Sequence, residues 1–473
     1  MPSTRQKLWP VSGCGGIAAG GDGFDPFDPY LLNLLMTLHS NPFMIVSNAL
    51  EGAISVELDW HNHAQAYRDS LLLEVNDLER SCNMAVVRRY RLQRFRDEMA
   101  RHDIAACVLF DPVNIRYASG ARNMQIFNAR NPARYLLVTQ DESAVILYEF
   151  TGCMHLADDL ETVTEVRPAI TASFVSAGDK IKQRESDWAS ETASTLTKLV
   201  GKGATVGIER INAGAVQALS EYGFVLVDAQ QPIERARAIK SGEEIACVKA
   251  SLHATEIAVA RLRQCLRPGL TENALWSILH QAVIAQNGDY IETRLLSSGQ
   301  RTNPWFQESG NRVIGKNELV ALDTDVVGCY GYYADFSRTF HSGPDEPNAD
   351  QRQLYAAAYE QIHHNMELLH PGLAFREYAE RAWKIPEKYF VNRYYLSAHG
   401  VGMTGEYPYL YHGADFLTAG YDGHIEVGMT LCVESYIGEV GGREGVKLEQ
   451  QVLVTPSGPE LLSNFPFEAS LRP

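Results

Sequence analysis

The chain of 473 residues lacks several features that would assign it to a specialised class of protein. Its 42 basic residues are outnumbered by 58 acidic ones, and the formal net charge of −16 opposes binding to nucleic acid or to an anionic membrane surface. The eight cysteines form no CxxC pair, which indicates a reducing, cytoplasmic compartment. A chain this long also buries enough apolar surface to fold without a structural metal. Any metal is therefore expected to serve chemistry.

The N-terminal part lacks targeting and membrane-spanning signals. Residues 29–50 carry no Lys, Arg, Asp or Glu, but Pro42 and many polar side chains interrupt them, which makes a membrane span unfavourable. The glycine-rich run GCGGIAAGGDG contains a GxGxxA match without a preceding strand, so we reject a dinucleotide site there. We interpret residues 1–82 as an N-terminal extension of unknown purpose.

The remainder of the chain predicts two domains. Alternating helical and extended patterns over residues 83–234, including a hairpin formed by YLLVTQ and AVILYEF, predict a compact α/β domain. Ser241 and Glu244 have the spacing of a capping box and open a long amphipathic helix, so we place the boundary near residues 230–238. Residues 235–473 alternate helices with hairpin strands and predict an α+β domain around an antiparallel sheet.

Three aspartates in ALDTDVVGCYGYYADFSRTF form the most informative pattern. Asp323 and Asp325 lie two apart on a predicted strand and therefore project from one face, and Asp335 follows a glycine-containing turn. If the two segments pair as a hairpin, the three acids converge in an apolar setting where only a cation would compensate their charge. The alternative is that they are surface aspartates flanking a turn.

Two glutamates and one histidine extend the pattern. Glu434 ends the apolar run TLCVE, Glu449 lies in VKLEQQVLV, and His399 stands in YYLSAHGVGM beside glycines that allow close approach of a substrate. Each alone is compatible with a strand surface or a structural histidine. Together they predict a site for divalent iron, manganese, cobalt or zinc rather than calcium, and bridging carboxylates would allow two metal ions.

The ordered set of acids and histidine, entered by a long helix, resembles the creatinase/prolidase superfamily with its pita-bread fold. Within it the chain is similar to the dimethylsulfoniopropionate (DMSP) lyases, through IETRLLSSGQRTNPWFQESG, DTDVVGCYG, HGVGM, MTLCVES and FDPVNIRYASGARNMQIFNARNP. The resemblance covers about residues 83–467. It implies a homodimer and cleavage of a small zwitterionic substrate, DMSP, to dimethyl sulfide and acrylate. It also implies a centre of two iron ions with six ligands: Asp323, Asp325, Asp335, His399, Glu434 and Glu449.

Details separate the lyases from the peptidases of the superfamily. The peptidases space two metal aspartates eleven apart, which here leads from Asp335 back to Thr324, and they place a substrate-contacting histidine where this chain has Glu406. The lyases carry a proposed catalytic aspartate six positions after the metal histidine, and here that position is Gly405. Glu406, Tyr394 or a hydroxide on the metal are then the candidates for the base.

The sulfonium group of DMSP needs a pocket that tolerates a cation, and aromatic faces provide one. Phe127, Trp305, Phe306 and Tyr394 lie in the matching segments, and core or rim packing is the alternative explanation for them. Two other functions stay open. One is a metallohydrolase acting on Xaa-Pro dipeptides or a small amidine or amide, and the other is a binding protein that has lost catalysis.

Overall fold

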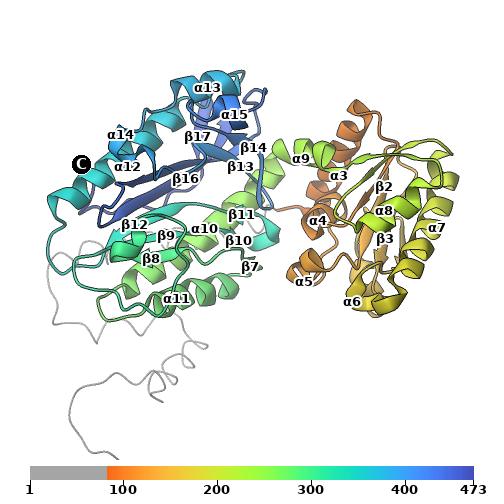
Figure 1. The fold of residues 1–473 in the computed structure, drawn as a ribbon, viewed down its shortest axis with the longest axis horizontal. Coiled ribbons are helices and arrows are strands. Elements are labelled where there is room, and N and C mark those ends of the chain that lie inside the picture. The colour runs from red at the N-terminus through yellow and green to blue at the C-terminus, as the bar shows by residue number, and fades with distance from the viewer. Residues whose placement is uncertain (1–81) are drawn as a thin grey trace, which may run out of the picture. The chain divides into compact units, whose positions relative to one another are not determined.

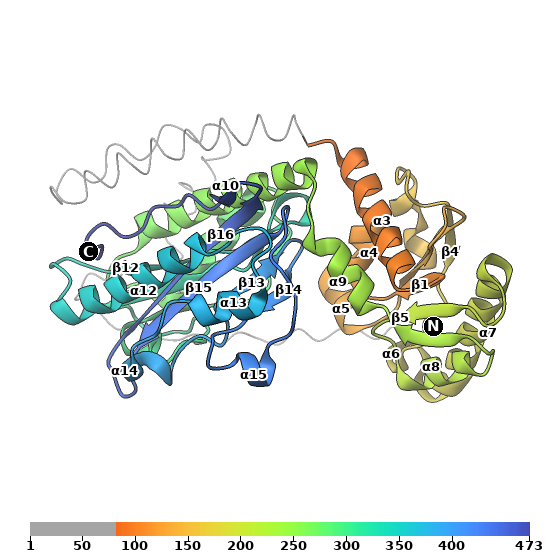
Figure 2. The same cartoon turned by 90° about the horizontal axis from the view of Figure 1, so that it is seen from above.

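The computed structural model describes residues 82–473. The predicted extension, residues 1–82, lies outside the described residues except for Cys82. The described chain forms the two predicted kinds of fold, an α/β domain followed by an α+β domain (Figure 1; Figure 2). Within residues 82–473, no helix combines the length and hydropathy needed to cross a membrane.

The first domain is a six-stranded mixed sheet in the order β4-β3-β2-β1-β5-β6, flanked by helices. The predicted hairpin is β2 and β3, which pair antiparallel, whereas β1 pairs parallel with β5. Trp188 is fully buried on α7 and contacts Phe110 and Tyr135, which anchors the helix on the sheet. The strands are β1 (Ala106–Leu109), β2 (Tyr135–Thr139), β3 (Val145–Glu149), β4 (Glu165–Pro168), β5 (Thr205–Ile208) and β6 (Val225–Asp228). The helices are α3 (Met84–Arg101), α4 (Pro112–Ser119), α5 (Gln125–Arg130), α6 (Phe174–Ala177), α7 (Ile181–Val200) and α8 (Ala213–Ser220).

Two helices lead into the second domain, α9 (Gln230–Ala238) and α10 (Gly242–Cys265). The predicted capping box is present at the start of α10. The Ser241 side chain accepts a hydrogen bond from the Glu244 backbone N–H at 3.2 Å, and Glu244 Oε2 accepts one from the Ser241 N–H at 3.1 Å. Both groups satisfy amide hydrogens that the helix itself leaves free, so α10 begins where the sequence predicts.

The second domain contains three antiparallel sheets, with strand orders β11-β10-β7, β12-β9-β8 and β14-β13-β15-β16-β17. Its strands are β7 (Tyr290–Ile291), β8 (Leu296–Ser298), β9 (Leu319–Asp323), β10 (Val326–Val327), β11 (Tyr333–Ala334), β12 (Ser337–His341), β13 (Ala398–Val401), β14 (Gly405–Leu410), β15 (Thr430–Gly438), β16 (Gly445–Thr455) and β17 (Gly458–Leu461). Its further helices are α11 (Glu272–Ala285), α12 (Ala349–Glu367), α13 (Phe375–Arg381), α14 (Glu387–Phe390) and α15 (Phe416–Ala419). Apolar residues of α12 pack on β15 and β16, which places the long hairpin in the interior.

The aspartate segment departs from the predicted continuous strand. β9 ends at Asp323 and β10 begins at Val326 in a different sheet, because Asp325 adopts a left-handed backbone with φ of 41°. Thr324 stabilises this break, since its hydroxyl donates to the Ala334 carbonyl and accepts from the Phe336 N–H, both at 3.0 Å. The expectation that Asp323 and Asp325 share one face of one strand is therefore wrong.

Candidate metal centre

The structure brings all six sequence-predicted ligands to one place. Glu434 on β15 and Glu449 on β16 are direct cross-strand partners, and His399 lies on the neighbouring strand β13 opposite Cys432. Asp323 ends β9, whereas Asp325 and Asp335 stand at the junctions of β9 with β10 and of β11 with β12. The pairing of β13, β15 and β16 positions the glutamates and the histidine, and the two junctions between strands turn the aspartates toward them.

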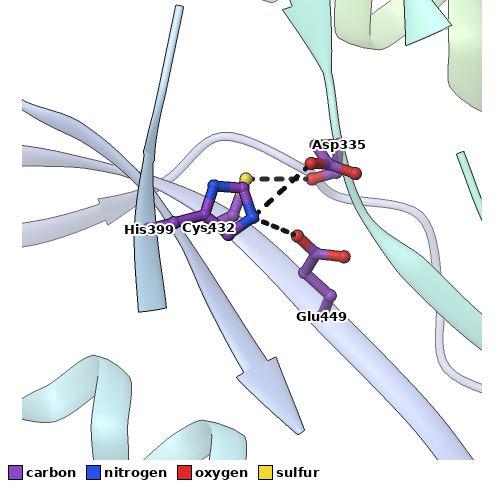
Figure 3. Close-up of side chains that lie close together, drawn as sticks. All are labelled: Asp335, His399, Cys432 and Glu449. Atoms are coloured by element: carbon purple, nitrogen blue, oxygen red, sulfur yellow. Dashed lines mark hydrogen bonds and ion pairs between the residues drawn. The ribbon is translucent and has the colours of Figure 1, made fainter. Parts of the chain in front are cut away.

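The imidazole of His399 is surrounded by carboxylates (Figure 3). His399 Nε2 lies 3.5 Å from Glu434 Oε1, 3.5 Å from Glu449 Oε1 and 3.7 Å from Asp335 Oδ2. Its other ring nitrogen, Nδ1, lies 2.9 Å from the Gly400 carbonyl oxygen, which can only accept, so Nδ1 carries a hydrogen. Nε2 is therefore the ring nitrogen that faces the carboxylates, and in the neutral form of the ring its lone pair is the one available to a metal.

The ligand atoms form two groups that share Asp335. In each group these atoms all lie within 4.8 Å of one another; the groups are Asp323, Asp325 and Asp335, and Asp335, His399, Cys432 and Glu449. Buried oxygens in the second group support a metal, because Asp335 Oδ1 and Glu449 Oε1 have no hydrogen-bond partner. The donors therefore fit the binding of metal, and Asp335 is available to both groups.

A lysine that the sequence analysis did not single out lies within this cluster. Lys447 is fully buried, and its Nζ lies 2.7 Å from Glu434 Oε2 and 3.1 Å from both Asp323 Oδ2 and Glu449 Oε2. It also donates to Ser337 Oγ at 2.7 Å, and that hydroxyl lies 2.7 Å from Asp323 Oδ1. The signal that predicts it is its position two residues before Glu449 on a strand, which places both side chains on one face.

The pKa values of these carboxyl groups depend on burial and on one another. Burial and the neighbouring Asp323 raise the pKa of Asp325 to about 7, and burial followed by Glu449 raises that of Asp335 well above its usual range. Burial also acts on Glu449, but Lys447 and His399 bring its pKa below the usual value. The site thus holds more negative charge than its own basic groups neutralise, and a cation relieves that cost.

Cys432 is the second residue that the sequence analysis missed. It lies two residues before Glu434 on β15 and is buried, with its Sγ 3.5 Å from the Asp335 carbonyl oxygen. Burial raises the pKa of its thiol well above the ordinary value, so the thiol is neutral. Side chains two residues apart on a strand share one face, so the rule that relates Lys447 to Glu449 also relates Cys432 to Glu434.

Three of the four predicted aromatic residues gather beside the carboxylates. Lys447 Nζ lies 5.0 Å from the ring centroid of Tyr394 and 5.6 Å from that of Trp305, and both distances are within cation–π range. Phe306 extends the group toward solvent, since its ring centroid lies 5.3 Å from that of Tyr394 and the side chain is 53% exposed. The faces of Trp305 and Tyr394 thus already accept a cation in this structure.

Phe127 is not brought to this group. It lies on α5 of the first domain with its side chain 46% exposed, and no ring contact links it to Trp305, Phe306 or Tyr394 among the described residues. Its role in substrate binding stays a prediction.

Glu406 lies on β14 opposite Gly400 and is ion-paired on both carboxylate oxygens. Its Oε2 accepts hydrogen bonds from Arg237 at 2.9 and 2.7 Å, and its Oε1 lies 2.5 Å from Lys240 Nζ. Arg237 in turn donates to Asn114 Oδ1 at 2.9 Å, which connects the residue to the first domain. Both oxygens of Glu406 are held by cations, so the geometry argues against its predicted role as the base.

Tyr394 is also a poor proton acceptor. It is largely buried, and burial followed by the charge of Glu434 raises its pKa well above the ordinary value, which keeps the hydroxyl protonated. Its aromatic ring lies within cation–π distance of Lys447 in the cluster.

Comparisons with known proteins agree with this architecture. Residues 91–239 match the creatinase/prolidase N-terminal domain, and residues 246–456 match metallopeptidase family M24. The chain is 35% identical to the dimethylsulfoniopropionate lyase DddP of Roseovarius nubinhibens over 84% of this chain and 89% of that protein. It is also 35% identical to the DddP of Roseobacter denitrificans, over 82% of this chain and 88% of that protein.

Solved structures agree on the fold. A dipeptidase PepE from Mycobacterium ulcerans matches with a TM-score of 0.65 and 20% identity, over 81% of this chain and 97% of that one. An Xaa-Pro dipeptidase from Bacillus anthracis matches with a TM-score of 0.64 and 20% identity, over 80% of this chain and 98% of that one. At this identity they establish the pita-bread architecture alone.

Proposed function

Because the chain belongs to the family of DMSP lyases DddP, within the creatinase/prolidase superfamily, we propose that it is a metal-dependent lyase that cleaves DMSP. The observation that carries the proposal is the contact of a buried ammonium group with two aromatic faces at the edge of a six-ligand metal centre. That arrangement suits a substrate with a sulfonium at one end and a carboxylate at the other.

Charge balance supports two divalent ions. The five carboxylates Asp323, Asp325, Asp335, Glu434 and Glu449 carry a charge of −5, and Lys447 contributes +1, which leaves −4 to be balanced. Two divalent cations supply that charge while His399 stays neutral. The oxygen-rich set with one imidazole suits iron, and it also accommodates manganese, cobalt or zinc.

The proposed reaction is a β-elimination. The bond from the α-carbon of DMSP to hydrogen breaks, the proton passes to a base, and the electron pair of that bond forms the double bond of acrylate. The bond from the β-carbon to sulfur breaks at the same time, and its own electron pair leaves on dimethyl sulfide. When bound, the metal supplies the positive charge that holds the substrate carboxylate and stabilises the negative charge developing beside it. The faces of Trp305 and Tyr394 hold the sulfonium, and the buried Trp305 limits the access of water to it.

The decisive experiment is gas-phase detection of dimethyl sulfide from purified protein and DMSP, with the metal content measured in the same sample. We expect dimethyl sulfide and acrylate in equal amounts, loss of both after chelation, and recovery after adding back a divalent metal. His399→Ala, which removes the imidazole ligand, should lower both metal content and turnover. Asp345→Asn is the matched control, since Asp345 contacts Asn317 at the exposed surface away from the ligands.

A metallohydrolase is the alternative, and an Xaa-Pro dipeptide tested beside DMSP separates the two. Hydrolysis of the dipeptide without release of dimethyl sulfide would contradict the lyase assignment. A protein that binds no metal and turns over neither substrate would instead be a binding protein on this scaffold. The homodimer and the cytoplasmic location stay predictions, which gel filtration with light scattering and cell fractionation would test.

A further inference from the structure

A further acid lies beside two of the predicted metal ligands, just outside the ends of three paired strands. In the sheet β11-β10-β7, Asp335 follows β11, Asp325 precedes β10 and Glu292 follows β7. The register continues past the strands, because the Glu292 N–H donates to the Asp325 carbonyl at 3.0 Å. Asp335, Asp325 and Glu292 therefore stand side by side across three strands, and Glu292 belongs to neither ligand group.

The carboxylate of Glu292 is linked to the metal centre through a tyrosine. The Tyr333 hydroxyl donates to Asp325 Oδ1 at 2.9 Å and also lies beside the Glu292 carboxylate. Thr293, the next residue, contacts Asp325 Oδ2 with its hydroxyl. Glu292 thus stands one hydroxyl group away from a metal ligand.

The other contact of Glu292 comes from the loop that follows the metal histidine strand. Thr404 Oγ1 donates to Glu292 Oε2 at 3.1 Å, and Glu292 is an exposed residue. The neighbouring Gly405 faces open space, since a Cβ added there would meet no atom within 4 Å. The exposed Glu292 carboxylate therefore lies next to a loop that has unfilled space at Gly405.

The charged surroundings of Glu292 differ from those of Glu406. Within residues 82–473 no ion pair joins it to a basic side chain, whereas Glu406 is held by Arg237 and Lys240. Lys447 already donates to three carboxylates and has no free lone pair. An unpaired, accessible carboxylate is the group that can take a proton from carbon.

We propose that Glu292 is the catalytic residue that accepts the α-proton of the substrate, with Thr404 orienting its carboxylate. This inference rests on the proposed lyase function. As the proton passes to Glu292, the electron pair of the broken C–H bond forms the double bond of acrylate and dimethyl sulfide leaves. Glu292 then releases the proton to solvent, which its exposure permits.

The test is Glu292→Gln, measured for turnover of DMSP, for metal content, and for the dissociation constant of 3-(trimethylammonio)propionate, a cationic propionate with a poor leaving group. We expect kcat to fall by about 10²-fold or more. We expect the dissociation constant to stay within about twofold of wild type and the metal content to stay unchanged, because glutamine keeps the size of the residue and one oxygen that can accept from Thr404. Glu346→Gln, the same change at an exposed acid paired with Arg352, is the control and should retain full turnover.

A second variant tests whether catalysis needs a carboxylate near Thr404 rather than residue 292 itself. The open space at Gly405 admits a carboxylate next to Thr404, so adding Gly405→Asp to Glu292→Gln should restore at least about tenfold of the lost kcat. A kcat of Glu292→Gln close to wild type, an equal loss of analogue affinity or metal, or no recovery with Gly405→Asp would overturn the proposal. If wild-type protein releases no dimethyl sulfide, the proposed function fails instead, and the two failures are thereby distinguished.

Discussion

Lys447 and Glu449 lie two residues apart on β16, and Lys447 Nζ is 3.1 Å from Glu449 Oε2 inside a fully buried carboxylate cluster. The strand that supplies a metal ligand therefore also supplies the ammonium that offsets part of the cluster's charge. A buried charge is tolerated only where it is paired, so the two side chains depend on each other.

We predict that Lys447→Met lowers the free energy of unfolding by about 3–5 kcal/mol in chelator, because Asp323, Glu434 and Glu449 lose their shared cation. Urea unfolding followed by circular dichroism measures the change. Lys249→Met, which removes an exposed partner of Glu460, should change stability by less than about 1 kcal/mol. Equal stability of the Lys447 variant and wild type would contradict the charge-balance argument.

Glu406→Gln is expected to destabilise the protein without abolishing catalysis. The substitution leaves Arg237 and Lys240 buried with a neutral partner, at a cost of about 3–5 kcal/mol. Turnover per bound metal should stay within a fewfold of wild type in folded protein. Glu234→Gln is the milder control, since Glu234 contacts Arg237 from a side chain that is 31% exposed. Loss of turnover in stable, metal-loaded Glu406→Gln would restore Glu406 as the base.

Tyr394→Phe and Tyr394→Leu separate the tyrosine's aromatic face from its hydroxyl. If the face binds the sulfonium, phenylalanine should preserve KM, and leucine should raise it about tenfold, as the loss of roughly 1–2 kcal/mol of cation–π attraction implies. Steady-state assays of dimethyl sulfide release provide both values. A large fall in kcat for Tyr394→Phe at unchanged KM would instead assign the hydroxyl a catalytic role.

Stability should decline with rising pH because of Glu209 in the first domain. Burial, followed by the charge of Asp111, raises the pKa of Glu209 from 4.5 to about 8 in the folded protein. Between these values the unfolded chain releases a proton that the folded protein retains, so unfolding becomes easier by up to about 1.4 kcal/mol for each pH unit. Below pH 4.5 Glu209 is protonated in both states, so the free energy of unfolding no longer changes with pH through this residue.

Glu209→Gln removes that titration. We expect the difference in unfolding free energy between variant and wild type to move in favour of the variant as the pH rises from 5 to 8, as measured by urea unfolding at each pH. A difference that is independent of pH would show that Glu209 is already ionised in the folded protein.

The sequence predicts the ligand set because the ligands follow local rules. Glu434 and Glu449 lie in apolar runs of alternating period, which become the paired strands β15 and β16, and the capping box at Ser241 starts α10 as predicted. The same period of two would also have found Lys447 and Cys432. The donor set is rich in oxygen and has one imidazole, and these residue types alone restrict which metal ions suit the site.

Only the tertiary structure decided what each residue contacts. Asp323 and Asp325 converge through a left-handed break between two sheets rather than along one strand, and no local pattern encodes that break. Glu406 is adjacent in sequence to the predicted base position, yet its carboxylate is held by Arg237 and Lys240, which lie more than 160 positions away. Glu292 is joined to the site by a register across three strands. Donor chemistry and strand period are properties of neighbouring residues, whereas charge pairing and access to substrate depend on long-range packing that the sequence specifies only through the complete fold.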